Sequence, residues 1–241
     1  MKQIGVITPV PSVIETYVQN SMLRQAVDKG IVHFQVVNLR DFAQGNYRQI
    51  DDTPFGGGPG MVMMAEPLLK AIEQTKKDLK FPTGGSVVYP SAQGKQWSHD
   101  LAEKFSQVEK LIFICGHYKG IDERVLEREV THEISIGDFI LSCGEIATLT
   151  IIDSIVRLIP GVLNAQESAN TDSFPTGLLD APYYTKPRNL DGMEVPEVLV
   201  SGHHGKINEW RQKKRENKTR IKRPDLWHKY LKEKKDSEKE S

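Results

Sequence analysis

Two loops rich in small residues follow apolar segments near the middle of the chain. They are Gly116-His-Tyr-Lys-Gly-Ile-Asp-Glu-Arg124 and Ser135-Ile-Gly-Asp-Phe-Ile-Leu-Ser-Cys-Gly-Glu145. Each apolar segment predicts a buried strand, and neighbouring loops at the carboxyl ends of strands bring backbone N–H and C=O groups close to a ligand. These residues therefore favour binding of a small molecule by backbone groups.

The common nucleotide-binding motifs are missing from the sequence. Met61 follows Gly56-Gly-Gly-Pro-Gly60 where a dinucleotide fingerprint needs glycine, and Gln96 follows Gly94-Lys95 where a phosphate-binding loop needs Ser or Thr. A cofactor would bind by another route.

A third loop, Tyr89-Pro-Ser-Ala-Gln-Gly94, also follows a strand-like run. Three such loops at one sheet edge form a crevice, the usual binding position in open α/β sheets. The alternative is three ordinary turns, in which Gly and Ser are common anyway.

The glycine cluster 56–60 is open to two interpretations as well. It is either a flexible surface turn or a backbone surface that a flipped base approaches closely.

The predicted elements alternate between strands and helices. Strand-like runs cover residues 3–8, 32–37, 86–89, 111–115 and 132–136, and helical patterns cover 64–77, 98–107 and 144–158. A further helix is expected to begin at Ser12, which has capping-box spacing with Glu15, and to close near Gly30. The fold class is therefore α/β with a largely parallel sheet.

The composition changes after Pro160. We predict a first domain at 1–160, a linker at 161–176 without helical or strand periodicity, and a small, mainly helical second domain at 177–241. The charged stretch 232–241 is predicted to be disordered.

The chain has no net charge, but its charge is unevenly distributed. Residues 201–241 carry 14 Lys/Arg against 7 Asp/Glu, so residues 1–200 carry a net charge of −7. A basic end on an acidic body predicts a polyanionic partner such as RNA. The alternative is a solvated helix face, with Trp210, Trp227 and Tyr230 packing a local core.

No apolar run is long enough for a transmembrane helix, and the N-terminus has no signal-peptide anatomy. Cys115 and Cys143 lack metal-ligand spacing, which predicts free thiols and a cytoplasmic protein. The seven histidines also lack such spacing, so no metal site is predicted.

Beyond these local patterns, the chain resembles the bacterial tRNA (guanine-N1)-methyltransferases, which belong to the knotted SPOUT methyltransferase superfamily. The matching segments are Asp51-Asp-Thr-Pro-Phe-Gly-Gly-Gly-Pro-Gly-Met61, Gly120-Ile-Asp-Glu-Arg124, Ser135-Ile-Gly-Asp138, Ile152-Asp-Ser154, Arg157-Leu-Ile-Pro-Gly-Val162, Asp172-Ser-Phe174, Gly177-Leu-Leu179 and Gly192-Met-Glu-Val-Pro-Glu-Val-Leu199. The resemblance implies a trefoil-knotted domain that binds S-adenosylmethionine, a C-terminal tRNA-binding domain, and a homodimer whose active sites use both subunits. It also associates Mg²⁺ with the activity, without a site in this sequence.

The resemblance assigns roles to residues of this chain. The implied cofactor-binding residues are Tyr89, Pro90, Ser91, Ala92, Gly116, Tyr118, Ser135, Ile136, Gly137, Phe139, Leu141, Cys143, Gly144 and Ala147. The expected substrate-binding residues are Asp51, Gly57, Gly58, Pro59 and Ser168, with Lys213, Lys214 and Arg215 on the basic segment.

Methylation of guanine N1 requires removal of the N1 proton and stabilisation of negative charge at O6. The resemblance implies Asp172 as the base and Arg157 as the cation for the guanosine at position 37, next to the anticodon. From the residues alone, the favoured interpretations are structural: Asp172 caps a short helix, and Arg157 satisfies a helix C-terminus.

The sequence departs from the usual family pattern at four positions. His117 and Lys119 stand in place of Arg and Glu, and Cys143 and Ala147 in place of Gly and Pro. Lys119 is expected to point outward or to pair with Glu123 or Glu145. The small side chain of Cys143 is tolerated if it faces away from the ligand. The competing functions are methylation of another RNA position and RNA binding without catalysis.

Overall fold

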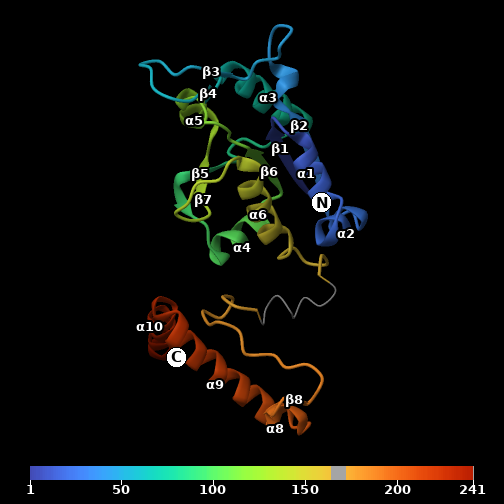
Figure 1. Ribbon diagram of the computed structural model, residues 1–241, viewed down its shortest axis with the longest axis vertical. Coiled ribbons are helices and arrows are strands. Elements are labelled where there is room, and N and C mark those ends of the chain that lie inside the picture. Colours follow the sequence, from blue (N-terminus) through green and yellow to red (C-terminus); the bar gives the residue numbers. More distant parts are fainter. Residues whose placement is uncertain (164–171, 241) are drawn as a thin grey trace. The chain divides into compact units, whose positions relative to one another are not determined.

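The computed structural model describes residues 1–163 and 172–240 (Figure 1). The chain divides into two compact units, Met1–Asn164 and Ala165–Ser241. The division between the two units falls within 161–176, the range predicted to be a linker.

The first unit is built on a five-stranded parallel sheet with the order β2-β1-β6-β5-β7 (Figure 1). The strands are β1 (Lys2–Thr8), β2 (Val32–Asn38), β5 (Ser86–Gln96), β6 (Lys110–Ile114) and β7 (His132–Ser135). The α/β class and the parallel sheet predicted from the alternating elements are confirmed.

Helices cover both faces of this sheet. Side chains alternate along β1, so Ile4 and Val6 face one helical layer and Ile7 faces the other. The first layer contains α1 (Pro11–Val18), α2 (Ser21–Asp28), α4 (His99–Gln107) and α6 (Gly144–Val156). The second contains α3 (Ala65–Asp78) and α5 (Glu123–Glu129). Two apolar cores therefore fix the strands, whose carboxyl ends carry the predicted loops.

The helix predicted from Ser12 to Gly30 is wrong, because two short helices occupy this stretch. Asn20 is extended between them, and its side-chain amide donates a hydrogen bond to the Thr16 carbonyl at 2.5 Å. The predicted capping box is also wrong. Helix α1 begins at Pro11 behind Val10, and no side chain caps it.

Strand β5 runs beyond its predicted end. A register shift between Pro90 and Lys95 interrupts its pairing with β7, and pairing resumes at Lys95 and Gln96. The predicted loop 89–94 is thus an irregular segment inside a strand, anchored at both ends. Smaller elements complete this unit: the 3₁₀ helix η1 (Leu39–Phe42) and the antiparallel pair β3 (Asp51–Asp52) and β4 (Val62–Met63).

The second unit contains the antiparallel pair β8 (Asn189–Leu190) and β9 (Met193–Glu194) and the helices α8 (Glu197–Val200), α9 (His204–Lys222) and α10 (Pro224–Glu240). Buried Thr219 on α9 accepts a hydrogen bond from the Leu179 N–H at 2.8 Å, which ties the preceding segment to the helix.

The structure continues α10 to Glu240, within the stretch predicted to be disordered. Lys and Glu are good helix formers, and Lys229 pairs with Glu233 at 3.8 Å on the same face.

Ordered structure also enters the predicted linker from both sides. Val162 is 1% exposed and packs in the core of the first unit, and the Lys29 ammonium donates to the Gly161 carbonyl at 3.0 Å. At the other end, Phe174 N–H donates to the Leu178 carbonyl at 2.9 Å.

Candidate active site

A cavity of about 410 Å³ lies at the carboxyl edge of the sheet in the first unit. Its wall includes all of the residues for which the sequence predicted cofactor binding, namely Tyr89, Pro90, Ser91, Ala92, Gly116, Tyr118, Ser135, Ile136, Gly137, Phe139, Leu141, Cys143, Gly144 and Ala147. The structure thus brings the three predicted loops together around one space. Their role in cofactor binding stays a prediction.

Glycine allows these loops to approach one another closely. The N–H of Gly144 donates to the carbonyl of Gly116 at 2.8 Å. A Cβ atom at Gly144 would lie 2.5 Å from the Gly116 nitrogen, closer than real Cβ contacts come. Gly137 has a φ angle of 148°, a conformation that side chains rarely adopt. The cavity is therefore framed by backbone groups.

Tyr89 closes one side of the cavity. The residue is 6% exposed, and a Cβ atom at Gly116 would lie 2.8 Å from its hydroxyl oxygen. Burial, together with the negative charge of Glu133, raises the pKa of Tyr89 to about 12. The side chain is therefore a neutral hydroxyl at physiological pH.

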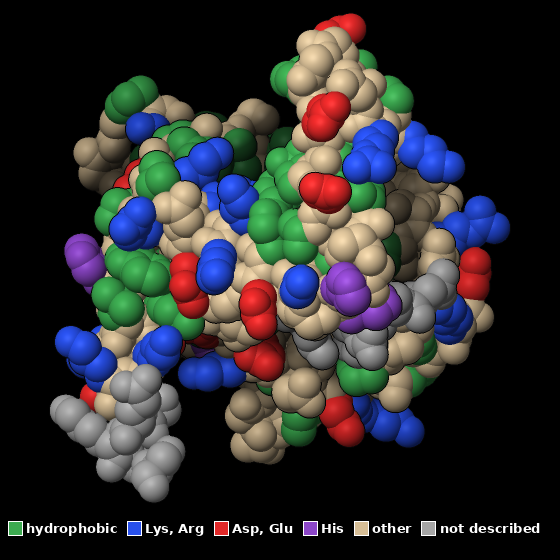
Figure 2. Space-filling model, turned by 90° about the horizontal axis from the view of Figure 1, so that it is seen from below, with side chains coloured by type: hydrophobic (Ala, Val, Ile, Leu, Met, Phe, Trp, Pro, Cys, Tyr) green, Lys and Arg blue, Asp and Glu red, His purple; other side chains and the backbone are tan. Residues whose placement is uncertain are grey.

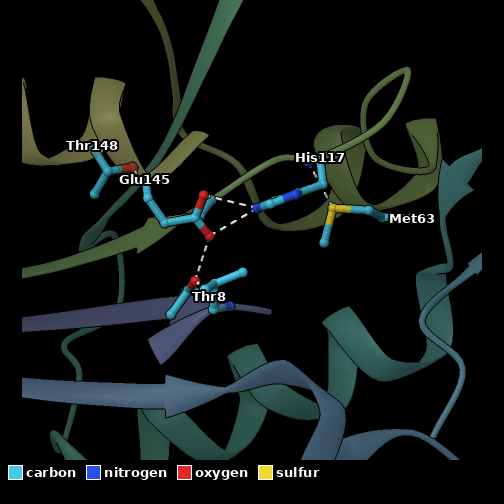
Figure 3. A network of polar contacts seen from close by, with 7 residues as sticks. Thr8, Met63, His117, Glu145 and Thr148 are labelled. Atoms are coloured by element: carbon cyan, nitrogen blue, oxygen red, sulfur yellow. Dashed lines mark hydrogen bonds and ion pairs between the residues drawn. The ribbon is translucent and has the colours of Figure 1, made fainter. Parts of the chain in front are cut away.

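Glu145 forms the centre of a buried polar network beside the cavity (Figure 3). Its side chain is buried, and the carboxylate accepts a hydrogen bond from the Thr8 hydroxyl at 2.5 Å and lies 2.8 and 2.9 Å from Nε2 of His117. Thr8 ends β1, His117 follows β6, and Glu145 stands in the first turn of α6. Three elements are thereby held together directly behind the cavity loops.

The network keeps Glu145 charged. Burial raises the pKa of its carboxyl group, but hydrogen bonds from His117 and Thr8 outweigh burial and hold the pKa below its ordinary value. Burial is the main cause of the raised pKa of the Cys115 thiol, and the negative charge of Glu145 raises that pKa further. The Cys115 sulfur lies 3.4 Å from the Thr148 hydroxyl. Cys115 is therefore an inert thiol at physiological pH.

The predicted pairing of Lys119 with Glu145 is wrong, because His117 occupies that carboxylate. Lys119 is exposed, in agreement with an outward direction, and it also borders the cavity. Its aliphatic carbons cover the backbone of Gly60, where a Cβ atom would lie 2.9 Å from Cγ of Lys119. Lys119 thus joins the cavity to the glycine cluster. Cys143 precedes α6 and lies on the cavity wall.

The predicted substrate-binding residues of the first unit lie outside the cavity wall. Asp51 is in β3, and Gly57 and Gly58 have φ angles of 78° and 109° in the following loop, with Pro59 next to them. The open space around these glycines is consistent with a surface loop.

The two predicted catalytic residues belong to different units. Arg157 is the C-cap residue of α6 in the first unit, and its N–H donates to the Asp153 carbonyl at 3.1 Å. Asp172 belongs to the second unit, where its carbonyl accepts a hydrogen bond from Arg215 at 3.4 Å. Ser168 lies outside the described residues.

The three basic residues of α9 predicted to bind substrate differ in their surroundings. Arg215 is partly buried and donates to the Thr176 hydroxyl at 2.9 Å, so it helps to hold its own unit together. Lys213 and Lys214 are exposed, and the Lys214 ammonium lies 5.4 Å from the ring centre of Trp210. Of these three residues, the two lysines present their charge to solvent.

Within the described ranges, no group of three or more His, Cys, Asp or Glu side chains could hold a metal ion. Cys115 and Cys143 are both free thiols. None of the described helices is both long and apolar enough to span a membrane.

Sequence reasoning missed Thr8 and His117 as partners of Glu145. A Glu in the first turn of a helix is an ordinary stabiliser of the helix dipole, so nothing local marks it as buried. The only available signal was that Gly144-Glu145 follows the cavity loop directly.

Fold and site together define an α/β protein with a backbone-lined crevice at the carboxyl edge of a parallel sheet. Residues 1–229 match the family described as tRNA (Guanine-1)-methyltransferase TrmD. Similar curated proteins are tRNA (guanine-N(1)-)-methyltransferases from Staphylococcus carnosus, 46% identical over 95% of this chain and 91% of the relative, and from Shouchella clausii, 48% identical over 93% and 91%. A third, from Clostridioides difficile, is 44% identical over 93% of this chain and 96% of the relative. The chain belongs to this tRNA (guanine-1)-methyltransferase family.

Proposed function

We propose that the protein transfers a methyl group from S-adenosylmethionine to N1 of the guanosine at position 37 of tRNA. The observation that carries this proposal is the cavity at the sheet edge, in a chain that belongs to this family. Its wall unites three loops that are far apart in the sequence.

The residues around the cavity fit the proposed methyl donor. A volume of about 410 Å³ is in the range of small-molecule sites. Ile136, Leu141 and Ala147 offer apolar contacts for an adenine ring, and the close approach of Gly116 and Gly144 leaves backbone groups to bind the polar parts. Neutral Tyr89 adds a hydroxyl group that carries no charge.

When bound, S-adenosylmethionine supplies an electrophilic methyl group on its sulfonium. The protein must then make guanine N1 nucleophilic, because the N1 lone pair is tied up while N1 carries a proton. We assign removal of this proton to Asp172 and stabilisation of the charge at O6 to Arg157. The network around Glu145 holds the loop of His117 in place and takes no proton from the substrate.

Several finer features belong to the same proposal. We propose a homodimer in which each active site takes its cofactor loops from one subunit and Asp172 from the other. The first unit would form a trefoil knot, as the family resemblance implies. The second unit would bind tRNA through the exposed lysines of α9, and the glycine cluster beside Lys119 would receive the guanine.

The test is to incubate unmodified tRNA with the purified protein and S-adenosylmethionine carrying a labelled methyl group. Nuclease digestion followed by mass analysis should place one labelled methyl group on N1 of guanosine 37. A label at another nucleotide would indicate methylation of a different RNA site. If the protein binds tRNA and leaves it unlabelled, it is a binding protein without this activity.

A further inference from the structure

A second cavity, of about 680 Å³, lies entirely within the C-terminal unit. The segment Pro182–Arg188 forms one side of it, and α8 and the first half of α9 form the other. Its floor is apolar, with Leu199 and Ile207 partly buried there. None of the roles assigned above uses this groove.

Two tyrosines at the rim present aromatic surface to solvent. Tyr183 is 69% exposed and Tyr184 is 49% exposed. The Tyr183 hydroxyl donates to Asp180 at 2.7 Å, and the ring of Tyr184 lies 6.4 Å from that of Trp210. Both rings are thus held by their own unit while part of their surface stays uncovered, which lowers the entropy cost of stacking a ligand on them.

The charged side chains that line the groove all have the same sign, and the nearest acidic group named above, Asp180, is hydrogen-bonded to the Tyr183 hydroxyl. Lys186, Arg188 and Arg211 line it, and no Asp or Glu does among the described residues. The adjoining helix α9 carries eight Lys and Arg against two Glu. On the face drawn in Figure 2, Lys and Arg side chains are interspersed with hydrophobic and acidic ones. An apolar floor, uncovered rings and cations at the rim complement a nucleobase with its phosphates.

We propose that this groove is a stacking site for an unpaired nucleotide of the RNA. The base would stack on Tyr183 or Tyr184, and the flanking phosphates would pair with Lys186, Arg188 and Arg211. This inference rests on the proposed tRNA substrate and adds base stacking to the phosphate contacts expected from α9. A second copy of the chain is the competing occupant, which the experiment also examines.

The full-length protein is titrated with a single-stranded oligoadenylate and with an abasic oligomer of the same backbone. Stacking on an aromatic ring is worth a factor of about 5 to 150 in affinity per base. Replacing both Tyr183 and Tyr184 by Ala should weaken oligoadenylate binding by such a factor and leave binding of the abasic oligomer unchanged. The double Tyr→Phe variant should bind much more tightly than the double alanine variant, since it keeps both rings and loses only the hydrogen bond between Tyr183 and Asp180. Tyr17→Ala, at a tyrosine of similar exposure in the first unit, is the control for losing any exposed ring.

The inference is overturned if the double alanine variant, folded by circular dichroism, binds oligoadenylate as the wild type does. It is equally overturned if the abasic oligomer binds as tightly as oligoadenylate, or if the variant changes only the oligomeric state. Methylation of tRNA is measured in parallel. A wild-type protein that methylates tRNA while the groove variants bind normally contradicts the stacking site alone, whereas absence of methylation contradicts the proposed function.

Discussion

Nε2 of His117 lies 2.8 Å from a carboxylate oxygen of the buried residue Glu145. This pair fixes the loop after β6 to the start of α6, and both segments border the cavity. A side chain from the loop after β6 therefore satisfies the buried carboxylate at the start of α6.

The first prediction concerns the contribution of this pair to stability. Glu145→Gln leaves an acceptor for Thr8 but removes the charge that faces His117, and should lower the free energy of unfolding by about 1–3 kcal/mol. Urea denaturation measures the decrease. Glu66→Gln breaks an exposed pair with Lys70 and should cost less than about 1 kcal/mol. Equal effects of both changes would show that the buried network stabilises the protein no more than an exposed ion pair does.

The same residue predicts a pH dependence. Burial raises the pKa of Glu145, yet its hydrogen bonds hold it below the ordinary value of 4.5, so between these two pKa values the unfolded chain binds more protons than the folded one. The stability that the carboxylate contributes is therefore present in full above about pH 4.5 and is lost as the pH falls through the lowered pKa. The difference in unfolding free energy between wild type and Glu145→Gln should shrink in that acidic range. A difference that grows on acidification would contradict the direction of the shift.

The third prediction tests the backbone contact between two cavity loops. Gly144→Ala places a Cβ atom 2.5 Å from the Gly116 nitrogen, so the loops must separate. We expect a decrease of about 1–3 kcal/mol in stability and weaker binding of S-adenosylmethionine, measured by calorimetry. Gly205→Ala in α9 has open space around it and should stay within about 0.5 kcal/mol of the wild type. Unchanged cofactor binding in the Gly144 variant would remove this contact from the site.

The sequence predicted the strands and cavity loops well because each depends on a local pattern. Apolar runs followed by glycine-rich turns mark buried strands, and the resemblance indicated which loops line one cavity. The break at Asn20 was missed because the amphipathic pattern continues across it. The contact between His117 and Glu145 and the contacts of Arg215 were missed. Each joins residues that are distant in the sequence, about which local patterns say nothing.

The fourth prediction separates the basic residues of α9. Changing both Lys213 and Lys214 to Gln should weaken tRNA binding and reduce the magnitude of its salt slope by about one for each phosphate that is no longer neutralised. Cofactor affinity should stay the same. Arg215→Gln removes the hydrogen bonds to Thr176 and Asp172 and should mainly lower the melting temperature. If the double lysine variant keeps the wild-type affinity and salt slope, the exposed face of α9 is only a solvated surface.

The most direct test of the proposed mechanism is single-turnover methylation of tRNA by Asp172→Asn, with thermal melting on the same preparation. Asn keeps the size of the side chain but cannot accept the N1 proton. A positioned base contributes on the order of 10²–10⁴-fold, so the rate should fall at least 100-fold while the melting temperature and S-adenosylmethionine affinity are retained. A near-normal methylation rate in a protein with a lowered melting temperature would make Asp172 a structural residue and contradict its role as the base.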